Sequence, residues 1–186
     1  MEYCKTCKNR NDKTVCELCG LDLSHYEAIP TIKDSGARKL YETGAVRDIQ
    51  EGKGACYLMP LNVVAHLANS AEIATVEMFR QTGNIDCLYE CLNCFSDRWF
   101  DSVEEMLLEV SKHFEAGAKK YGPNNWQKGI PIHSYIDSAL RHYLKFCAGI
   151  TDEPHGIAFV WNILCAIWTM ENKPEMNDFT VRKDVQ

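Results

Sequence analysis

The sequence lacks an apolar segment long enough to cross a membrane. Its longest apolar stretch, residues 156–170, spans 15 residues and contains Asn162, whereas a membrane helix needs about 20. The first residues contain cysteine and lysine in place of an apolar signal core. We therefore expect neither a membrane partner nor a secretion signal.

The sequence also lacks an excess of positive charge. It has 20 Lys and Arg against 26 Asp and Glu, a net charge of −6. General nucleic-acid binding requires a basic surface that neutralises many phosphates, so this class of function is disfavoured. A single nucleotide needs only a few local cations and stays possible. The 186 residues suffice for one well-packed domain and a small appendage.

Cysteine, by contrast, is abundant, with ten in the chain. Without a secretion signal, this favours metal binding in a reducing cytosol over disulfides. Two CxxC pairs, Cys4 with Cys7 and Cys16 with Cys19, suit the tetrahedral geometry of zinc. We predict a Cys4 module with a structural Zn²⁺ over residues 1–23. The alternative is a tail of free thiols.

A glycine-rich segment, residues 35–60, shows neither a helical nor a strand period. Lys53 lies between two glycines, and Arg38 and Arg47 precede it. Glycine lets the backbone approach a phosphate closely. The segment is therefore a candidate anion-binding loop, the alternative being an ordinary solvated loop.

Helical periodicity marks most of the remaining chain. The predicted helices cover residues 61–82, 103–121, 134–148 and 154–171. The last is apolar nearly all round, so we expect it at the centre of the fold. The fold class we predict is all-α: a helical bundle over residues 35–171, with a C-terminal tail at 172–186.

Three cysteines, Cys87, Cys91 and Cys94, lie within eight residues. They would bind a metal if a fourth ligand came from elsewhere. The alternative is partly buried thiols on a short helix.

Polar residues interrupt the apolar faces of the predicted helices 134–148 and 154–171. Another polar residue lies at the edge of the apolar face of helix 103–121. Glu115 lies at the edge of the apolar face of helix 103–121, and Asp137 and Arg141 are one turn apart on the next helix. His155 and Asn162 share a stripe of small residues on the last. Carboxylates and imidazoles on neighbouring helices suit a divalent metal and a phosphate.

Each of these residues also has an ordinary structural explanation. Glu115 and Lys119 form a common surface pair at i, i+4. His155 and Asn162 are equally consistent with buried groups that find partners in the core. His142 lies about 140° around the helix from Asp137, so the two should not bind the same ion. Either His142 reaches another site, or it has a core or capping role. Trp126, in a loop with amides and a lysine, suits base stacking or anchoring in the core.

Four blocks of sequence, taken together, resemble a known family. They read SGARKLYETGAVRDIQEGKG (35–54), EAGAKKYGPNNWQKGI (115–130), DSALRHYLKFCAG (137–149) and PHGIAFVWNIL (154–164). In this order they resemble the phage-associated dATP/dGTP diphosphohydrolase N-terminal family. The resemblance covers about half of the chain and implies an all-α domain similar in style to MazG-like nucleotide pyrophosphohydrolases.

The resemblance implies Mg²⁺-dependent cleavage of a purine deoxynucleoside triphosphate to the monophosphate and pyrophosphate. Glu115 and Asp137 would bind Mg²⁺, with His155 in support. The substrate would be bound by the cations and by residues able to contact the base, namely Arg38, Arg47, Lys53, Lys119, Lys120, Trp126, Arg141 and Asn162. It further implies a homo-oligomer in the cytoplasm, that of the host if the protein is phage-encoded.

Two positions depart from the family pattern after the GKG motif. Ala55 and Tyr57 stand where relatives usually have arginine and aspartate. If the missing aspartate is a metal ligand in relatives, hydrolysis would be lost here. The alternative function is therefore a protein that binds or sequesters a nucleotide or nucleotide signal without cleaving it.

Overall fold

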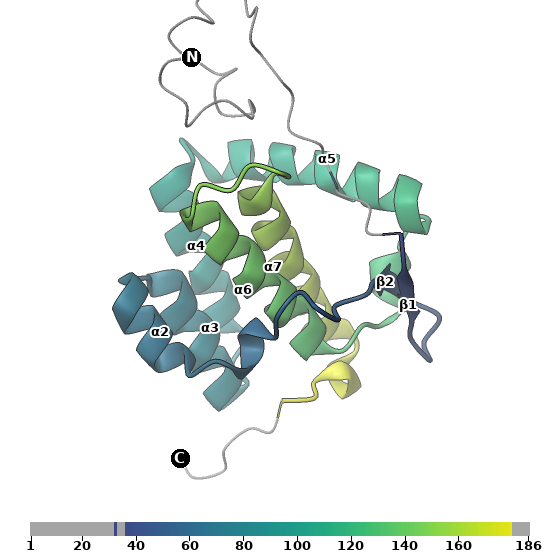
Figure 1. Cartoon of the computed structure of the whole chain (residues 1–186), viewed down its shortest axis with the longest axis horizontal. Helices are drawn as coiled ribbons and strands as arrows, with labels where there is room; N and C mark the ends of the chain where they lie inside the picture. The colour runs from purple at the N-terminus through teal and green to yellow at the C-terminus, as the bar shows by residue number, and fades with distance from the viewer. Residues whose placement is uncertain (1–31, 33–35, 180–186) are drawn as a thin grey trace, which may run out of the picture.

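The structure is a computed structural model that describes residue 32 and residues 36–179. In this part of the chain six α-helices account for most residues, which confirms the all-α class (Figure 1). They are α2 (Leu61–Ala68), α3 (Ala71–Thr82), α4 (Asp86–Trp99), α5 (Val103–Tyr121), α6 (Ile132–Cys147) and α7 (His155–Asn172). Short 3-10 turns cover Cys56–Leu58, Asn125–Lys128 and Pro174–Met176. Cys4, Cys7, Cys16 and Cys19 lie outside the described residues, so the zinc module stays a prediction.

The two most buried helices, α6 and α7, pack against each other at the centre of the molecule (Figure 1). Helices α2, α3 and α4 cover one side of this pair, and α5 packs across α7. The side chains of Phe95, Tyr135, Ile136, Phe159 and Ile163 are fully buried between these elements. None of the described helices combines the length and apolar character that crossing a membrane requires.

One predicted helix, 61–82, is two helices in the structure. Asn69 adopts the left-handed conformation with φ of 47° and ends α2. Ser70 then accepts a hydrogen bond from the Ile73 amide through its Oγ and starts α3. Asparagine tolerates this backbone conformation and serine is a favoured N-cap. The prediction of one continuous helix was therefore wrong at this local break.

The glycine-rich segment contains a β-hairpin where we expected no regular structure. Strand β1 (Arg38–Leu40) pairs antiparallel with β2 (Val46–Asp48), and Lys39 lies opposite Arg47. Strands of three residues are too short to show a period in the sequence. Gly44, with φ of 79°, supplies the positive dihedral of the turn.

Candidate functional site: a polar cavity between the hairpin and the last three helices

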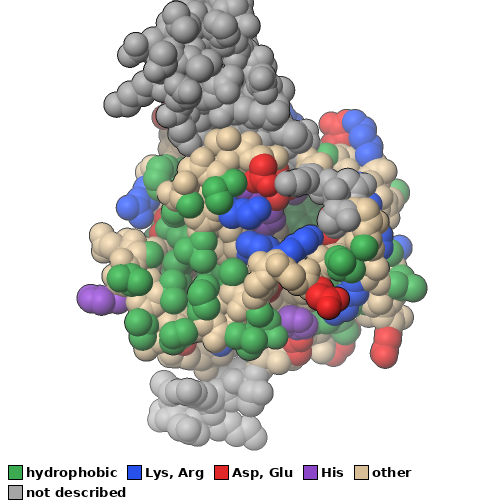
Figure 2. Space-filling model, in the orientation of Figure 1, with side chains coloured by type: hydrophobic (Ala, Val, Ile, Leu, Met, Phe, Trp, Pro, Cys, Tyr) green, Lys and Arg blue, Asp and Glu red, His purple; other side chains and the backbone are tan. Residues whose placement is uncertain are grey.

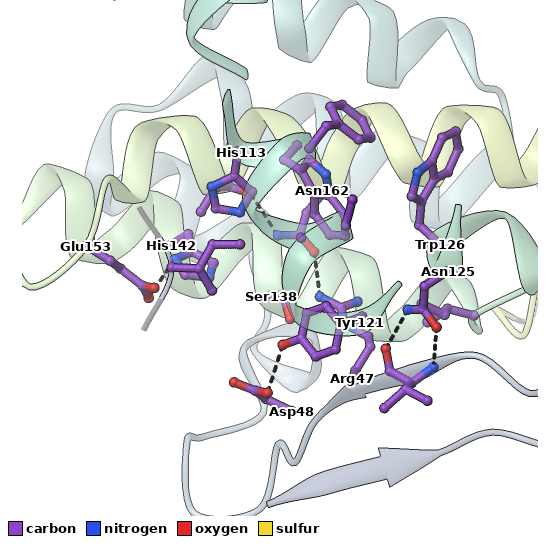
Figure 3. A pocket seen from close by; sticks show the side chains of 18 of the residues that line it. Arg47, Asp48, His113, Tyr121, Asn125, Trp126, Ser138, His142, Glu153 and Asn162 are labelled. Atoms are coloured by element: carbon purple, nitrogen blue, oxygen red, sulfur yellow. Dashed lines mark hydrogen bonds and ion pairs between the residues drawn. The ribbon is translucent and has the colours of Figure 1, made fainter. Parts of the chain in front are cut away.

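A cavity of about 650 Å³ lies between β2, the end of α5, the loop after it, and the facing sides of α6 and α7 (Figure 3). Pockets for small ligands commonly have volumes of about 300–1,000 Å³. In Figure 2, Lys and Arg side chains gather around a hollow in this face of the molecule. The cavity therefore has the size and the rim of a site for an anionic small molecule.

Arg47 reaches from β2 into the centre of this cavity (Figure 3). Its Nη2 donates to Asn162 Oδ1 at 2.7 Å, and its guanidinium lies 5.0 Å from the ring centre of Tyr135. Its Nη1 is buried and makes no hydrogen bond within the described residues. The guanidinium is thus held by an amide and by the Tyr135 and Trp161 rings, and its Nη1 group is left for a ligand.

Two further buried polar atoms belong to residues of the cavity wall and also lack a hydrogen-bond partner in the described part of the chain. Trp161 Nε1 and His113 Nδ1 have no hydrogen-bond partner among the described residues. The two rings lie 5.7 Å apart, between centres. Buried polar groups in native proteins nearly always find a partner. Together with Arg47 Nη1 they indicate a cavity built to receive a polar ligand.

The hairpin is fastened to the helical domain on both sides of Arg47. Asn125 accepts from the Val46 amide at 2.9 Å and donates to the Val46 carbonyl at 2.7 Å. Asp48 accepts from Tyr121 Oη at 2.7 Å and pairs with Arg38 and Lys120, each at 2.9 Å. These contacts fix the strand that carries Arg47.

Among the residues that the structure describes, equal numbers of basic and acidic side chains line the cavity. The basic ones are Arg47, Lys53, Arg141 and Lys145, and the acidic ones are Asp48, Glu115, Asp152 and Glu153. Desolvation lowers the pKa of Lys53. The lining is therefore close to neutral in total, and a highly charged anion would need additional positive charge.

A compact group of His142, His155 and Glu153 forms where α6 and the start of α7 meet. His142 Nδ1 lies 2.9 Å from His155 Nδ1, and Glu153 Oε1 is 3.6 and 3.5 Å from these two atoms. His142 and Glu153 face the cavity. Burial lowers the pKa of both imidazoles, well below its ordinary value for His142, which favours their neutral form.

Sequence reasoning missed the role of His142 and Glu153 in this group. Helix geometry places His142 about 140° away from Asp137. It does not show which residues of the next helix lie close to His142. The only signal was the alternative that His142 reaches another site. Glu153, in the loop before α7, had no periodic pattern to mark it.

The structure brings several predicted site residues to the cavity and leaves others outside it. Glu115, Arg47, Lys53, Trp126, Arg141 and Asn162 line the cavity, whereas Asp137, His155, Arg38, Lys119 and Lys120 do not. Arg38 and Lys120 act on the cavity indirectly, through Asp48. Their substrate contacts, like those of Lys119, remain untested predictions.

The two carboxylates predicted to bind magnesium each have a cation of their own helix. Glu115 is 65% exposed and pairs with Lys119, which lowers the pKa of Glu115. Asp137 is buried, pairs with Arg141 at 2.6 Å and accepts from the Tyr57 amide. Within the described residues, the one group of His, Cys, Asp and Glu atoms close enough to hold a metal includes neither. Glu115 lies on the cavity lining and Asp137 outside it, and their assignment to magnesium stays an untested prediction.

The cysteines of α4 do not form such a group within the described residues either. Cys87 and Cys91 are buried in the core. Burial raises the pKa of Cys91 to about 12, and a protonated thiol is a poor metal ligand. Their place in the structure is that of buried thiols.

We predict that the protein loses folding stability in acid because His113 is buried. Burial lowers its pKa to about 4, against about 6.5 for an unperturbed histidine. Because the folded pKa lies below the unfolded one, the unfolded chain binds the extra proton between these values. Stability should therefore decrease as pH falls from about 6.5 to 4, by about 3 kcal/mol from this residue.

Urea denaturation of wild type and His113→Phe at pH 7, 5.5 and 4.5 measures this contribution. The variant should lose less stability on acidification, although the buried His142 and His155 will leave part of the pH dependence in place. Equal pH slopes in the two proteins would show that His113 does not titrate as expected.

One of the comparisons with known proteins supports the resemblance, over three of the four sequence blocks. The searches of curated proteins and of solved structures returned no match. A family model does match residues 99–179, the segment that contains α5, α6, α7 and most of the cavity wall. The match does not extend to the hairpin that carries Arg47. Residues 99–179 thus match the family described as dATP/dGTP diphosphohydrolase, N-terminal, which confirms the family resemblance of the chain.

Proposed function

We propose that the cavity binds a purine deoxynucleoside triphosphate and that the chain hydrolyses it to the monophosphate and pyrophosphate. The observation that carries this proposal is a set of three buried polar atoms, on Arg47, His113 and Trp161, that have no hydrogen-bond partner among the described residues. The matched family supports the substrate class, since its description names dATP and dGTP.

The lining offers separate surfaces for the two ends of such a molecule. Lys53 lies within electrostatic range of Arg141 and Glu153, and Lys145 pairs with Asp152, next to Glu153 in the chain. These three cations line the cavity and would bind the phosphates. Trp126 and Tyr121 line the wall nearer the hairpin and would contact the purine. Arg47 lies between them, where its free Nη1 would donate to an acceptor of the ligand.

Hydrolysis requires water to attack phosphorus and the bond between the α- and β-phosphates to break. The equal number of acidic and basic side chains on the lining leaves little net positive charge for a triphosphate. A bound cation would supply that charge and polarise the phosphoryl oxygens. We assign no step to Glu115 and Asp137, since each carboxylate is already paired with a cation of its own helix.

A second function, binding without cleavage, is favoured by one specific observation. Asp137 is already held by Arg141 and by the Tyr57 amide, and Tyr57 stands where the resemblance of the sequence blocks implies an aspartate. Tyr57 does not line the cavity, so a chain without this carboxylate would retain the cavity's contacts to a nucleotide. It would then sequester the nucleotide or a related signal.

Pyrophosphate release from each of the eight common NTPs and dNTPs, with Mg²⁺ or Mn²⁺, decides between the two functions. We expect release from dATP or dGTP in preference to pyrimidine nucleotides. Glu115→Gln and Asp137→Asn test the predicted metal carboxylates in the same assay. If both variants remain active, these residues do not hold a required ion.

Binding is measured in parallel by isothermal titration calorimetry with a non-hydrolysable purine dNTP analogue. Binding without pyrophosphate release would support the sequestering function. No binding of any nucleotide would contradict both functions. Lys112→Ala, a change on the exposed side of α5, is the matched control and should leave both measurements unchanged.

A further inference from the structure

Three side chains from two elements converge at one end of the cavity. His142 projects from α6, His155 begins α7, and Glu153 precedes it by two residues. Their side chains are 16%, 0% and 13% exposed. This degree of burial sets them apart from the exposed acidic groups that are common on protein surfaces.

The facing atoms have the spacing of metal ligands. The distances between His142 Nδ1, His155 Nδ1 and Glu153 Oε1 are 2.9, 3.5 and 3.6 Å. A point close to their plane therefore lies about 2 Å from all three atoms, and ligand bonds to zinc are about 2.0–2.2 Å. An ion would fit with little movement of the side chains.

A carboxylate behind one imidazole orients it toward this point. Asp152 Oδ1 accepts from His155 Nε2 at 2.7 Å. In the neutral ring this places the proton on Nε2 and leaves the lone pair of Nδ1 directed at His142 and Glu153. Histidines that bind metals characteristically donate their other nitrogen to a carboxylate in this way.

We propose that His142, His155 and Glu153 form a binding site for a divalent first-row transition metal. Two imidazoles and one carboxylate suit Mn²⁺, Fe²⁺, Co²⁺ or Zn²⁺, whereas Mg²⁺ prefers oxygen ligands. This site differs from the predicted magnesium pair, Glu115 and Asp137, and from the predicted Cys4 module.

Three protein ligands leave open coordination positions. Since His142 and Glu153 line the cavity beside Arg141 and Lys145, these positions face the proposed nucleotide. The ion would add the positive charge that the lining lacks for a triphosphate and could bind a phosphate oxygen. This role rests on the proposed function, but metal binding itself does not.

Titration of the metal-free full-length chain with Mn²⁺, followed by electron paramagnetic resonance, tests the proposal without nucleotide. Mn²⁺ is chosen because thiolates favour softer metals, so the predicted Cys4 module should contribute little. We expect one Mn²⁺ per chain, with the same result in Cys4→Ser. A Co²⁺ titration should add visible d–d absorption that persists in Cys4→Ser.

Loss of a ligand should weaken this binding by at least about 10-fold. His142→Ala and Glu153→Gln are the two test variants, and the second nearly preserves side-chain shape in case the first does not fold. His66→Ala, on the exposed face of α2, is the matched control. The proposal is overturned if Mn²⁺ does not bind, or if Glu153→Gln binds it as tightly as wild type.

The metal and nucleotide experiments fail independently. If His142, His155 and Glu153 bind Mn²⁺ but the chain binds no nucleotide, the proposed function is refuted and the metal site stands. If Glu153→Gln leaves nucleotide hydrolysis unchanged and these residues bind no Mn²⁺, the metal site is refuted and the proposed function stands.

Discussion

Replacement of Arg47 by alanine is expected to weaken the binding of purine dNTPs by about 10- to 100-fold. A hydrogen bond from a charged donor is worth about 1.5–3 kcal/mol when its partner is buried, and about 1.4 kcal/mol corresponds to a factor of ten. Arg47 lines the cavity, and its Nη1 is buried without a hydrogen-bond partner among the described residues. Isothermal titration calorimetry with a non-hydrolysable analogue measures the change.

Two further variants of the hairpin make this test specific. Arg47→Lys keeps the charge but loses the planar guanidinium that bonds Asn162 and stacks on Tyr135, so most of the affinity should still be lost. Lys39→Ala, the matched control, removes an exposed cation directly opposite Arg47 in the hairpin. This variant should bind the nucleotide analogue with wild-type affinity. An Arg47→Ala protein with wild-type affinity would place the ligand elsewhere.

Replacement of Phe95 by alanine is expected to cost about 3–5 kcal/mol of folding free energy. Phe95, on α4, is fully buried. Five aromatic rings surround it with centres 4.8–6.5 Å away, those of Trp99, Phe100, Tyr143, Phe146 and Phe159. Removal of the ring leaves a cavity where α4 meets α6 and α7, and a rigid aromatic cluster closes such a space poorly.

Urea denaturation followed by circular dichroism measures this loss as a lower midpoint at an unchanged slope. Leu67→Ala is the matched control, because Leu67 is 86% exposed on α2 and its truncation should change stability by less than about 0.5 kcal/mol. A loss below about 1 kcal/mol for Phe95→Ala would contradict the packing described for α4, α6 and α7.

The long helices were predictable because their signal is local and repeated. The apolar face of α5 recurs over 19 residues, and Ser102 caps its start by accepting from the Glu105 amide. Helix α7 has an apolar circumference, which placed it correctly at the centre. The break at Asn69 was missed because one left-handed residue leaves the apolar pattern on either side almost unchanged.

The candidate site was predictable only in part. Arg47, Lys53, Trp126, Arg141 and Asn162 were marked by residue type and all line the cavity. The pairing of Asp137 with Arg141 was equally visible as an i, i+4 pair, and it occupies the carboxylate assigned to magnesium. Whether such a carboxylate binds a side chain or an ion depends on neighbours that periodicity does not reveal.

By itself, the sequence determined the helical class, the positions of the long helices and the family resemblance, because each depends on patterns within short stretches of chain. Only the tertiary structure decided which polar groups share one cavity. Arg47 meets Asn162 across 115 positions of sequence, and His142 meets His155 because the loop after α6 folds α7 back against it. Such contacts arise from the packing of whole helices, and no local sequence pattern shows which distant residues they will bring together.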